Sequence, residues 1–369
     1  DFEFPKNRSL ESELPQEELS NVHHIALARW CDRFVVAPLS ANTLSRFSQG
    51  LTDDLLSSVF LSLAPRTPKI FFPAMNSKML GHPFTQQNQQ KLQELPQTFI
   101  HPTCSGDLAC GEEGHGRLAP FEEMADLIES FPLNPFRAAK LLISTGATMA
   151  PLDPVRYMTN PSSGRTGYEL AKKALQAGYK VKALAGMGSH DKLSRLCAHP
   201  QFEMVKINTN KEMHEAVKKS LPSSQAFISA AAVTDLKFPD RPTKLKKEDF
   251  QGKGEIHYDK DVDILQEAIE QKRPGQFFVG FAAETDLTDT ILREKQKRKP
   301  VDFLVGTRVR FTPGQTGQKE DEAVAGFKKE HADYALLKND SIDWKTLTKK
   351  ELAALLLKEI DAALNNDEA

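Results

Sequence analysis

Short apolar runs alternate with amphipathic stretches along most of the chain. In its first third, apolar runs predict strands at residues 33–40 and 69–76. Apolar positions at helical spacing predict helices between and after these strands, at residues 40–50, 53–64, 84–95 and 121–131. Strands that alternate with helices favour parallel sheets covered by helices on both faces.

A second and longer series of the same kind follows a short proline-containing stretch. The predicted elements alternate between strand and helix, in the order 140–146, 167–178, 179–186, 211–221, 225–233, 262–272, 276–284, 287–299 and 302–307. A last helix carries Leu352, Leu355, Leu356 and Ile360 on one stripe. We therefore expect an α/β fold with two doubly wound, mostly parallel-sheet, Rossmann-like domains, with boundaries at residues 1–131 and 140–369 and a linker at 132–139.

Composition and charge narrow the classes of partner. The 369 residues are 40% hydrophobic and 27% charged, which is enough material for two globular cores. A formal net charge of −2 gives no basic field for nucleic acid or an anionic membrane. The sequence shows no apolar run of membrane-spanning length, and its opening residues resemble neither a signal nor a transit peptide. We expect a cytoplasmic protein that binds small molecules and other subunits, without nucleic-acid or membrane partners.

Residues 101–120, HPTCSGDLACGEEGHGRLAP, concentrate cysteines, histidines, carboxylates and glycines. This composition argues against a regular helix or strand and leaves three interpretations: a metal site, a disulfide loop or a mobile part of an active site. The four cysteines of the chain are too few for a disulfide framework. A zinc site would use His101, Cys104, Cys110 and His115, although structural zinc sites more often pair their cysteines as CxxC.

In the second half, two stretches follow predicted strands, where open α/β sheets bind ligands. Residues 144–171 bring hydroxyl groups and glycines to the start of a helix, which suits a phosphate or carboxylate. They contain neither a P-loop lysine nor a dinucleotide fingerprint, so an ordinary Ser/Gly N-cap with a turn explains them equally well. Farther on, Asp235 precedes Lys244, Lys246 and Lys247, which suit a polyphosphate or form a solvated face. The basic run 293–300 is interpreted as the polar side of a helix.

Eight motifs carry a resemblance to known enzymes. The second half resembles the phosphopantothenate–cysteine ligase domain of coenzyme A biosynthesis in residues 153–171, 230–235, 244–247 and 279–285. The first half is similar to the flavin-dependent phosphopantothenoylcysteine decarboxylase in residues 23–32, 38–56, 73–79 and 105–117. The resemblance implies a bifunctional enzyme that joins 4′-phosphopantothenate to cysteine with CTP, through an acyl-cytidylate. It also implies an FMN-dependent decarboxylation of the product to 4′-phosphopantetheine.

For the decarboxylase, the resemblance implies a catalytic base, a proton donor and binding residues. His24 matches the base, and Cys110 matches the cysteine that returns a proton to the product enethiolate. The implied substrate-binding residues are Asn76, Met79 and Arg117, and those near the flavin phosphate are Ser40, Asn42 and Thr43. Taken alone, either His23 or His24 is more often a structural surface histidine, and Asn76 is also a candidate cap of the next helix.

For the ligase, the resemblance implies that Lys244 helps to form the acyl-cytidylate and that Asn160 acts on this intermediate. The implied nucleotide-binding residues are Ala231, Ala232, Asp235, Lys247 and Phe281, with Mg²⁺ on the triphosphate and no metal site built from protein alone. Phe281 lies in a predicted strand and is also a candidate core aromatic.

One departure from the family bears on the first domain. No predicted strand and glycine-rich turn precede His24, so we expect this flavoprotein domain to be truncated, without its N-terminal flavin-binding segment. The alternative is therefore an active ligase joined to an inactive or non-catalytic flavoprotein-like interaction domain. Because the flavin sites of this family form between subunits and its ligase domains pair, we also expect a homo-oligomer.

Overall fold

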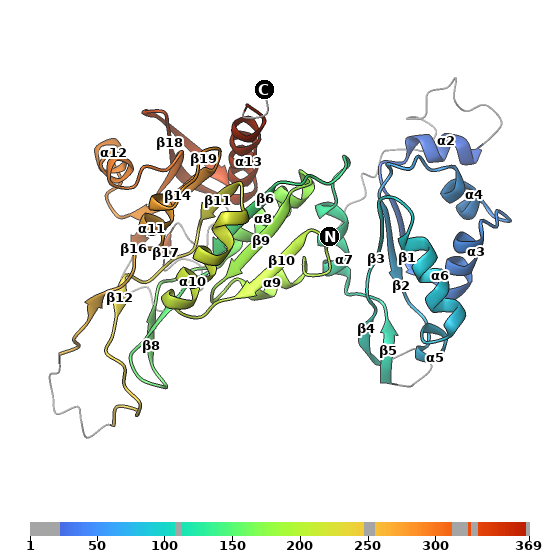
Figure 1. The fold of residues 1–369 in the computed structure, drawn as a ribbon, viewed down its shortest axis with the longest axis horizontal. Helices are drawn as coiled ribbons and strands as arrows, with labels where there is room; N and C mark the ends of the chain where they lie inside the picture. The colour runs from blue at the N-terminus through green and yellow to red at the C-terminus, as the bar shows by residue number, and fades with distance from the viewer. Residues whose placement is uncertain (1–22, 108–112, 247–254, 312–323, 326–330, 367–369) are drawn as a thin grey trace. The chain divides into compact units, whose positions relative to one another are not determined.

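The computed structural model describes residues 23–107, 113–246, 255–311, 324–325 and 331–366 (Figure 1). It divides into two compact units, Asp1–Pro135 and Phe136–Ala369. Each unit is built on a sheet in which parallel strands dominate, and this confirms the expected α/β class.

The first unit is built on a three-stranded parallel sheet. Its strands follow one another in the order β1 (Phe34–Leu39), β2 (Lys69–Pro73) and β3 (Thr98–Ile100). Its helices are α2 (His23–Trp30), α3 (Ala41–Gln49), α4 (Leu55–Ser62), α5 (Ser77–Leu80), α6 (Pro83–Gln93) and α7 (Phe121–Ser130). The core is aromatic: the rings of Phe47 and Phe60 stack with their centroids 4.2 Å apart, beside Phe34 and Phe71.

A hairpin occupies the stretch in which we expected no regular strand, so that prediction is wrong. Strands β4 (Cys104–Asp107) and β5 (Glu113–Arg117) pair antiparallel. The glycines that argued against a strand are what this hairpin requires. A Cβ at Gly116 would lie 2.1 Å from the carbonyl oxygen of Met75, so only glycine lets the two backbones approach this closely.

The second unit contains an eight-stranded sheet (Figure 1). Its strands are β6 (Lys140–Thr145), β9 (Lys180–Ala185), β10 (Phe202–Lys206), β11 (Ala226–Ser229), β14 (Phe277–Glu284), β15 (Phe303–Arg308), β18 (His331–Lys338) and β19 (Ser341–Thr348). They lie in the order β10-β9-β6-β11-β14-β15-β18-β19. The first six run parallel, whereas β18 and β19 add an antiparallel edge that our sequence analysis did not anticipate.

Helices cover both faces of this sheet. One face packs against α8 (Arg165–Gln176) and α13 (Lys349–Asn366), and the other against α10 (Asn210–Ser220), α11 (Ile264–Glu270) and α12 (Asp289–Arg298). Alternate strand residues enter opposite cores: Leu141 and Ile143 face α8 and α13, whereas Leu142 faces the other layer. Two shorter helical segments are α9 (His190–Ser194) and η1 (Leu221–Ser223).

Small hairpins lie in the connections that follow β6, β11 and β15. They pair β7 (Met149–Pro151) with β8 (Tyr157–Thr159), β12 (Leu236–Lys237) with β13 (Asp259–Lys260), and β16 (Arg310–Phe311) with β17 (Val324–Ala325). Among the described residues, no helix has the length and apolar character needed to cross a bilayer.

Candidate functional site

A cavity of about 490 Å³ opens in the second unit at the carboxyl ends of β6, β11 and β14. Thr145 ends the first of these strands, Ala231 and Ala232 follow the second, and Phe281 lies in the third. The start of α8 completes the wall with residues 160–167. This is the edge at which parallel α/β sheets bind ligands, so the cavity is the candidate active site of this unit.

Two glycines let α8 begin directly against the sheet. A Cβ at Gly167 would lie 2.1 Å from Thr145 Oγ1, and one at Gly164 would lie 2.5 Å from Ser189 Cβ. Gly164 also has a φ of 62°. The N-cap residue Gly164 receives no side-chain cap hydrogen bond, and Ser162 Oγ accepts from Gly164 N instead. The N-cap is therefore a glycine whose amide donates to Ser162, in agreement with the alternative interpretation of this stretch as an ordinary Ser/Gly N-cap with a turn. The first-turn amides of α8 border the cavity, where they suit an anion.

Most of the predicted ligase residues meet at this cavity. Asn160, Ala231, Ala232, Asp235 and Phe281 all line it. The loops that carry them are joined to one another, because Asn160 Nδ2 donates to the Val233 carbonyl at 2.8 Å and Ala232 N donates to the Gly146 carbonyl at 2.8 Å. Phe281 is half-buried and packs partly against the core, as its alternative interpretation expected, and it also lines the cavity.

Two predicted lysines are not brought into the site: one lies elsewhere, and the other is outside the described residues. Lys244 is exposed on the connection between β12 and β13, and the structure does not place it in the cavity wall. Lys247 lies outside the described residues.

Our sequence analysis missed five charged residues that line the cavity: Arg165, Asp263, Lys295, Lys299 and Lys349. Lys295 pairs with Glu284, and Lys299 Nζ lies 2.6 Å from Asp263 Oδ2. Burial raises the pKa of Asp263, but the hydrogen bonds from Lys299 and the Gln266 amide outweigh it and leave this pKa below its ordinary value. Lys295 lies in α12 and Lys299 is its C-cap residue, and no local sequence pattern distinguishes lysines that face a cavity from lysines that face solvent.

Lys349 is the most buried of these cations, at 4% exposure. Burial, followed by the charges of Arg165 and Lys192, lowers its pKa from 10.5 to about 8. The cavity therefore contains a lysine that a bound anion would favour in its charged form.

The stability of the second unit should depend on pH through Lys349. Between about pH 8 and 10.5 the unfolded chain binds more protons at this lysine than the folded chain, so the free energy of unfolding should rise with pH across this window. Lys349→Met should remove that contribution, whereas substitution of its exposed neighbour, Lys350→Met, should leave it in place. Denaturant unfolding measured across the window tests this, and equal pH slopes for wild type and Lys349→Met would contradict it.

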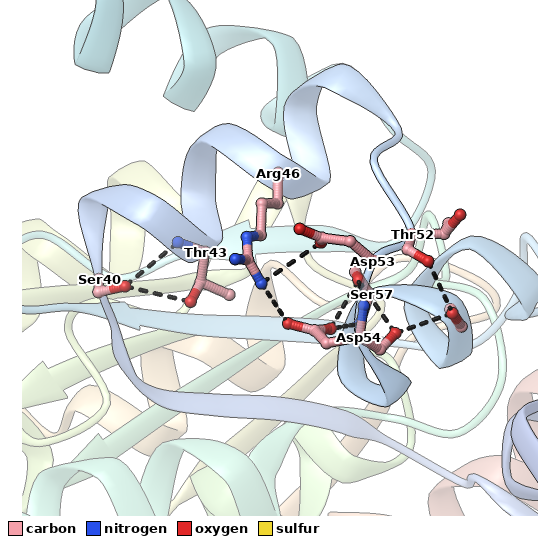
Figure 2. Close-up of polar contacts among 8 residues, drawn as sticks. Ser40, Thr43, Arg46, Thr52, Asp53, Asp54 and Ser57 are labelled. Atoms are coloured by element: carbon pink, nitrogen blue, oxygen red, sulfur yellow. Dashed lines mark hydrogen bonds and ion pairs between the residues drawn. The ribbon is translucent and has the colours of Figure 1, made fainter.

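In the first unit, the residues expected near a flavin phosphate lie where β1 leads into α3. Ser40 Oγ accepts from Thr43 N at 3.2 Å and lies 3.1 Å from Thr43 Oγ1, as Figure 2 shows. Asn42 is exposed in the same turn. Hydroxyl and amide donors at a helix start fit a phosphate monoester. Arg46 of this helix pairs with Asp53 and Asp54, which fixes α3 to the start of α4 (Figure 2).

The expected substrate-binding residues of this unit lie on segments that are joined by hydrogen bonds. Met75 N donates to the Gly116 carbonyl at 3.0 Å, and Ser77 Oγ donates to the His115 carbonyl. The hairpin that carries Arg117 is thereby held against the segment that carries Asn76 and Met79. Asn76 Oδ1 accepts from Lys78 N at 2.8 Å, so Asn76 does cap α5, as its alternative interpretation expected.

The remaining predicted residues of the first unit lie on another helix or outside the described residues. His24 is half-buried on α2. Cys110 lies outside the described residues. The histidines of the zinc alternative have other partners: His101 Nε2 contacts Glu123 at 3.2 Å, and His115 Nδ1 contacts Ser105 Oγ at 2.9 Å. Within the described part of the chain, no three histidine, cysteine or carboxylate side chains gather as metal ligands.

Two protein-family models match the chain. The model described as DNA/pantothenate metabolism flavoprotein C-terminal domain matches residues 136–364, and the model described as Flavoprotein matches residues 6–132. The second match includes the residues ahead of His24, so the expectation of a flavoprotein domain without its N-terminal flavin segment is wrong. That expectation relied on one local pattern, a strand with a glycine-rich turn, whereas the family match begins at residue 6.

Two similar proteins align with most of the chain. The coenzyme A biosynthesis bifunctional protein CoaBC of Vibrio parahaemolyticus is 35% identical over 337 residues, which cover 89% of this chain and 81% of the relative. CoaBC of Escherichia coli is 32% identical over 342 residues, or 91% and 79% of the two chains. A solved structure of a Cab2 mutant with phosphopantothenate-cysteine, 17% identical, covers 63% of this chain and 90% of that one with a TM-score of 0.50, a likeness of fold alone. The matched domains and these relatives show that the chain belongs to the CoaBC family of coenzyme A biosynthesis bifunctional proteins.

Proposed function

We propose that this chain catalyses two consecutive reactions of coenzyme A biosynthesis. The second unit joins 4′-phosphopantothenate to cysteine at the expense of CTP, and the first unit decarboxylates the product to 4′-phosphopantetheine with FMN. The observation that carries the proposal is the cavity of the second unit, which collects Asn160, Ala231, Ala232, Asp235 and Phe281 from separate motifs into one site.

The cavity suits a nucleotide. The amides at the start of α8, together with Arg165 and Lys349, offer positive charge to a triphosphate, and Phe281 offers an aromatic surface to a base. Lys244 supplies a further positive charge while the carboxylate of 4′-phosphopantothenate attacks the α-phosphate and pyrophosphate leaves. The amine of cysteine then attacks the acyl-cytidylate and releases CMP, with Asn160 beside the acyl group. Mg²⁺ would be bound through the triphosphate oxygens, because the described residues gather no metal site of their own.

The first unit supplies the residues of the decarboxylation. Ser40, Asn42 and Thr43 would hold the phosphate of FMN at the start of α3. FMN, when bound, supplies the transient oxidation of the cysteinyl side chain that makes loss of carbon dioxide easy. In this account His24 acts as the base, Asn76 and Arg117 hold the substrate, and Cys110 returns a proton to the enethiolate. A cytoplasmic location and assembly into homo-oligomers are part of the same proposal.

The function is tested by following each half-reaction in the purified protein. With 4′-phosphopantothenate, cysteine, CTP and Mg²⁺, we expect CMP, pyrophosphate and the cysteine adduct in equal amounts. Addition of FMN should convert the adduct to 4′-phosphopantetheine. Formation of the adduct without further conversion would leave a ligase joined to a non-catalytic domain, and absence of CMP would refute the ligase assignment.

A further inference from the structure

A short segment at the start of α11 forms one wall of the cavity, with residues 262–265 among the lining residues. Two contacts hold this segment from the side of the site. Asp261 N donates to the Asp235 carbonyl at 2.9 Å, and Lys299 Nζ lies 2.6 Å from Asp263 Oδ2. Both Asp235 and Lys299 line the cavity themselves.

A third contact comes from a residue that does not line the cavity. Asn210 lies in the first turn of α10 and is only 2% exposed. Its Nδ2 donates to the Val262 carbonyl at 3.0 Å. The start of α10 is itself fixed, because Thr209 Oγ1 accepts from Glu212 N at 3.2 Å and Glu212 Oε2 accepts from Asn208 N at 2.8 Å. Asn210 therefore holds the Val262 carbonyl from a rigid support.

The direction of the Val262 carbonyl fixes the other half of the same peptide. In a planar trans peptide the carbonyl and the amide point in opposite directions. The Asp263 amide therefore points away from Asn210, and Asp263 lines the cavity whereas Asn210 does not. Among the described residues, none accepts a hydrogen bond from this amide. The segment thus offers the cavity a backbone donor whose direction is set by Asn210.

The side chain of Asn210 contributes little to the stability of the fold. Its Oδ1 is buried and receives no hydrogen bond from any residue that the structure describes. A buried acceptor without a partner destabilises the folded chain, and this cost offsets the gain from the bond to Val262. Stability alone therefore does not account for an amide side chain at this position, whereas control of the Asp263 amide does.

We propose that Asn210 is a specificity-determining positioning residue, which directs the Asp263 amide to N3 of the cytosine base. Among the acceptors of cytosine, N3 alone is replaced by a donor in uracil, so it is the atom at which one fixed donor selects CTP. The inference rests on the nucleotide site proposed above and extends it to a residue outside the cavity wall. The loss of one such hydrogen bond should weaken binding about tenfold.

Calorimetry of nucleotide binding tests the inference without reference to catalysis. With Mg²⁺, the wild type should bind CTP about tenfold more tightly than 3-deaza-CTP, in which a C–H group replaces N3. Asn210→Ala should weaken CTP about tenfold and leave 3-deaza-CTP unchanged, so that the preference disappears. In steady-state ligation the same variant should raise the KM for CTP and leave kcat and the KM for cysteine unchanged.

The outcomes separate this inference from the proposed function. Equal weakening of both nucleotides in Asn210→Ala, or wild-type affinity for CTP, would overturn the inference and leave the ligase assignment in place. A wild type that binds no CTP would refute the nucleotide site, and the inference with it.

Asn208→Ala is the matched control, because Asn208 is an exposed asparagine two residues earlier. We expect it to bind both nucleotides as the wild type does. Thermal unfolding completes the test: Asn210→Ala should change Tm by less than about 3 °C, because the lost hydrogen bond and the removed unpaired acceptor offset each other. A larger decrease in Tm with an unchanged preference for CTP would assign Asn210 a merely structural role.

Discussion

Lys244→Gln should reduce formation of the acyl-cytidylate by about 1,000-fold, the range seen when one fixed charge-stabilising group is removed from a transition state. Glutamine keeps much of the length of lysine but has no charge to offer the transferring phosphate. The measurement is a single turnover of CTP and 4′-phosphopantothenate without cysteine, in which the activated intermediate and pyrophosphate are quantified after acid quench. Decarboxylation of supplied phosphopantothenoylcysteine should be unaffected, because the first unit carries that reaction.

Lys237 provides the control for Lys244. It is also exposed and lies in β12, at the start of the same connection. Lys237→Gln removes an equal charge from this connection and should leave the single-turnover rate unchanged. Equal losses in the two variants would show that only the general positive charge of the segment matters, and the specific role of Lys244 would then be refuted.

Gly116→Ala should abolish most of the decarboxylation and spare ligation. The added methyl would lie 2.1 Å from the Met75 carbonyl oxygen, so the hairpin β4–β5 would have to move away from the segment that carries Asn76. The backbone of Gly116, with a φ of 132°, also disfavours any side chain. We expect a decrease of about 100-fold in release of carbon dioxide from phosphopantothenoylcysteine. The reason is that the hairpin that carries Arg117 would shift relative to the segment that carries Asn76.

Gly50→Ala is the control variant for Gly116→Ala, because it introduces backbone strain without a steric clash. Gly50 ends α3 with a φ of 67°, yet a Cβ at this position would have no neighbour within 4 Å. Its substitution should cost about 1 kcal/mol in stability and little activity. If both alanine variants lost decarboxylation to the same extent, backbone strain alone would explain the loss, and the docking of the hairpin would have no special role.

The fold was largely predictable because the apolar pattern of each strand is strong. Residues such as Leu141, Leu142 and Ile143 are buried on both faces of a parallel sheet and form a continuous apolar run. The antiparallel edge was missed because β19 is mostly exposed and carries few apolar residues. A signal was nevertheless present: Asn339 and Asp340 both have positive φ, and this dipeptide between two strand-length runs is typical of a tight hairpin turn.

The candidate site was predictable only where a sequence motif carried it. Asn160 and Asp235 are recognised by their neighbours in the chain, and both line the cavity. Lys295 and Lys299 were interpreted as the polar side of a helix, because a lysine that faces solvent and one that faces a cavity have the same local pattern. Lys349 was missed for a related reason: it begins a helix, and only the tertiary packing buries it. The contact of Asn210 with Val262 joins segments too far apart for any local pattern to reveal.

The most direct test of the account uses cysteine labelled with ¹³C in its carboxyl group. This carbon leaves as carbon dioxide only if the chain first ligates cysteine and then decarboxylates the product. With 4′-phosphopantothenate, CTP, Mg²⁺ and FMN, the account predicts labelled carbon dioxide in an amount equal to the CMP formed, and none when CTP is omitted. Label that accumulates in the ligated product, without labelled carbon dioxide, after CTP is consumed would contradict the proposal that this chain performs both reactions.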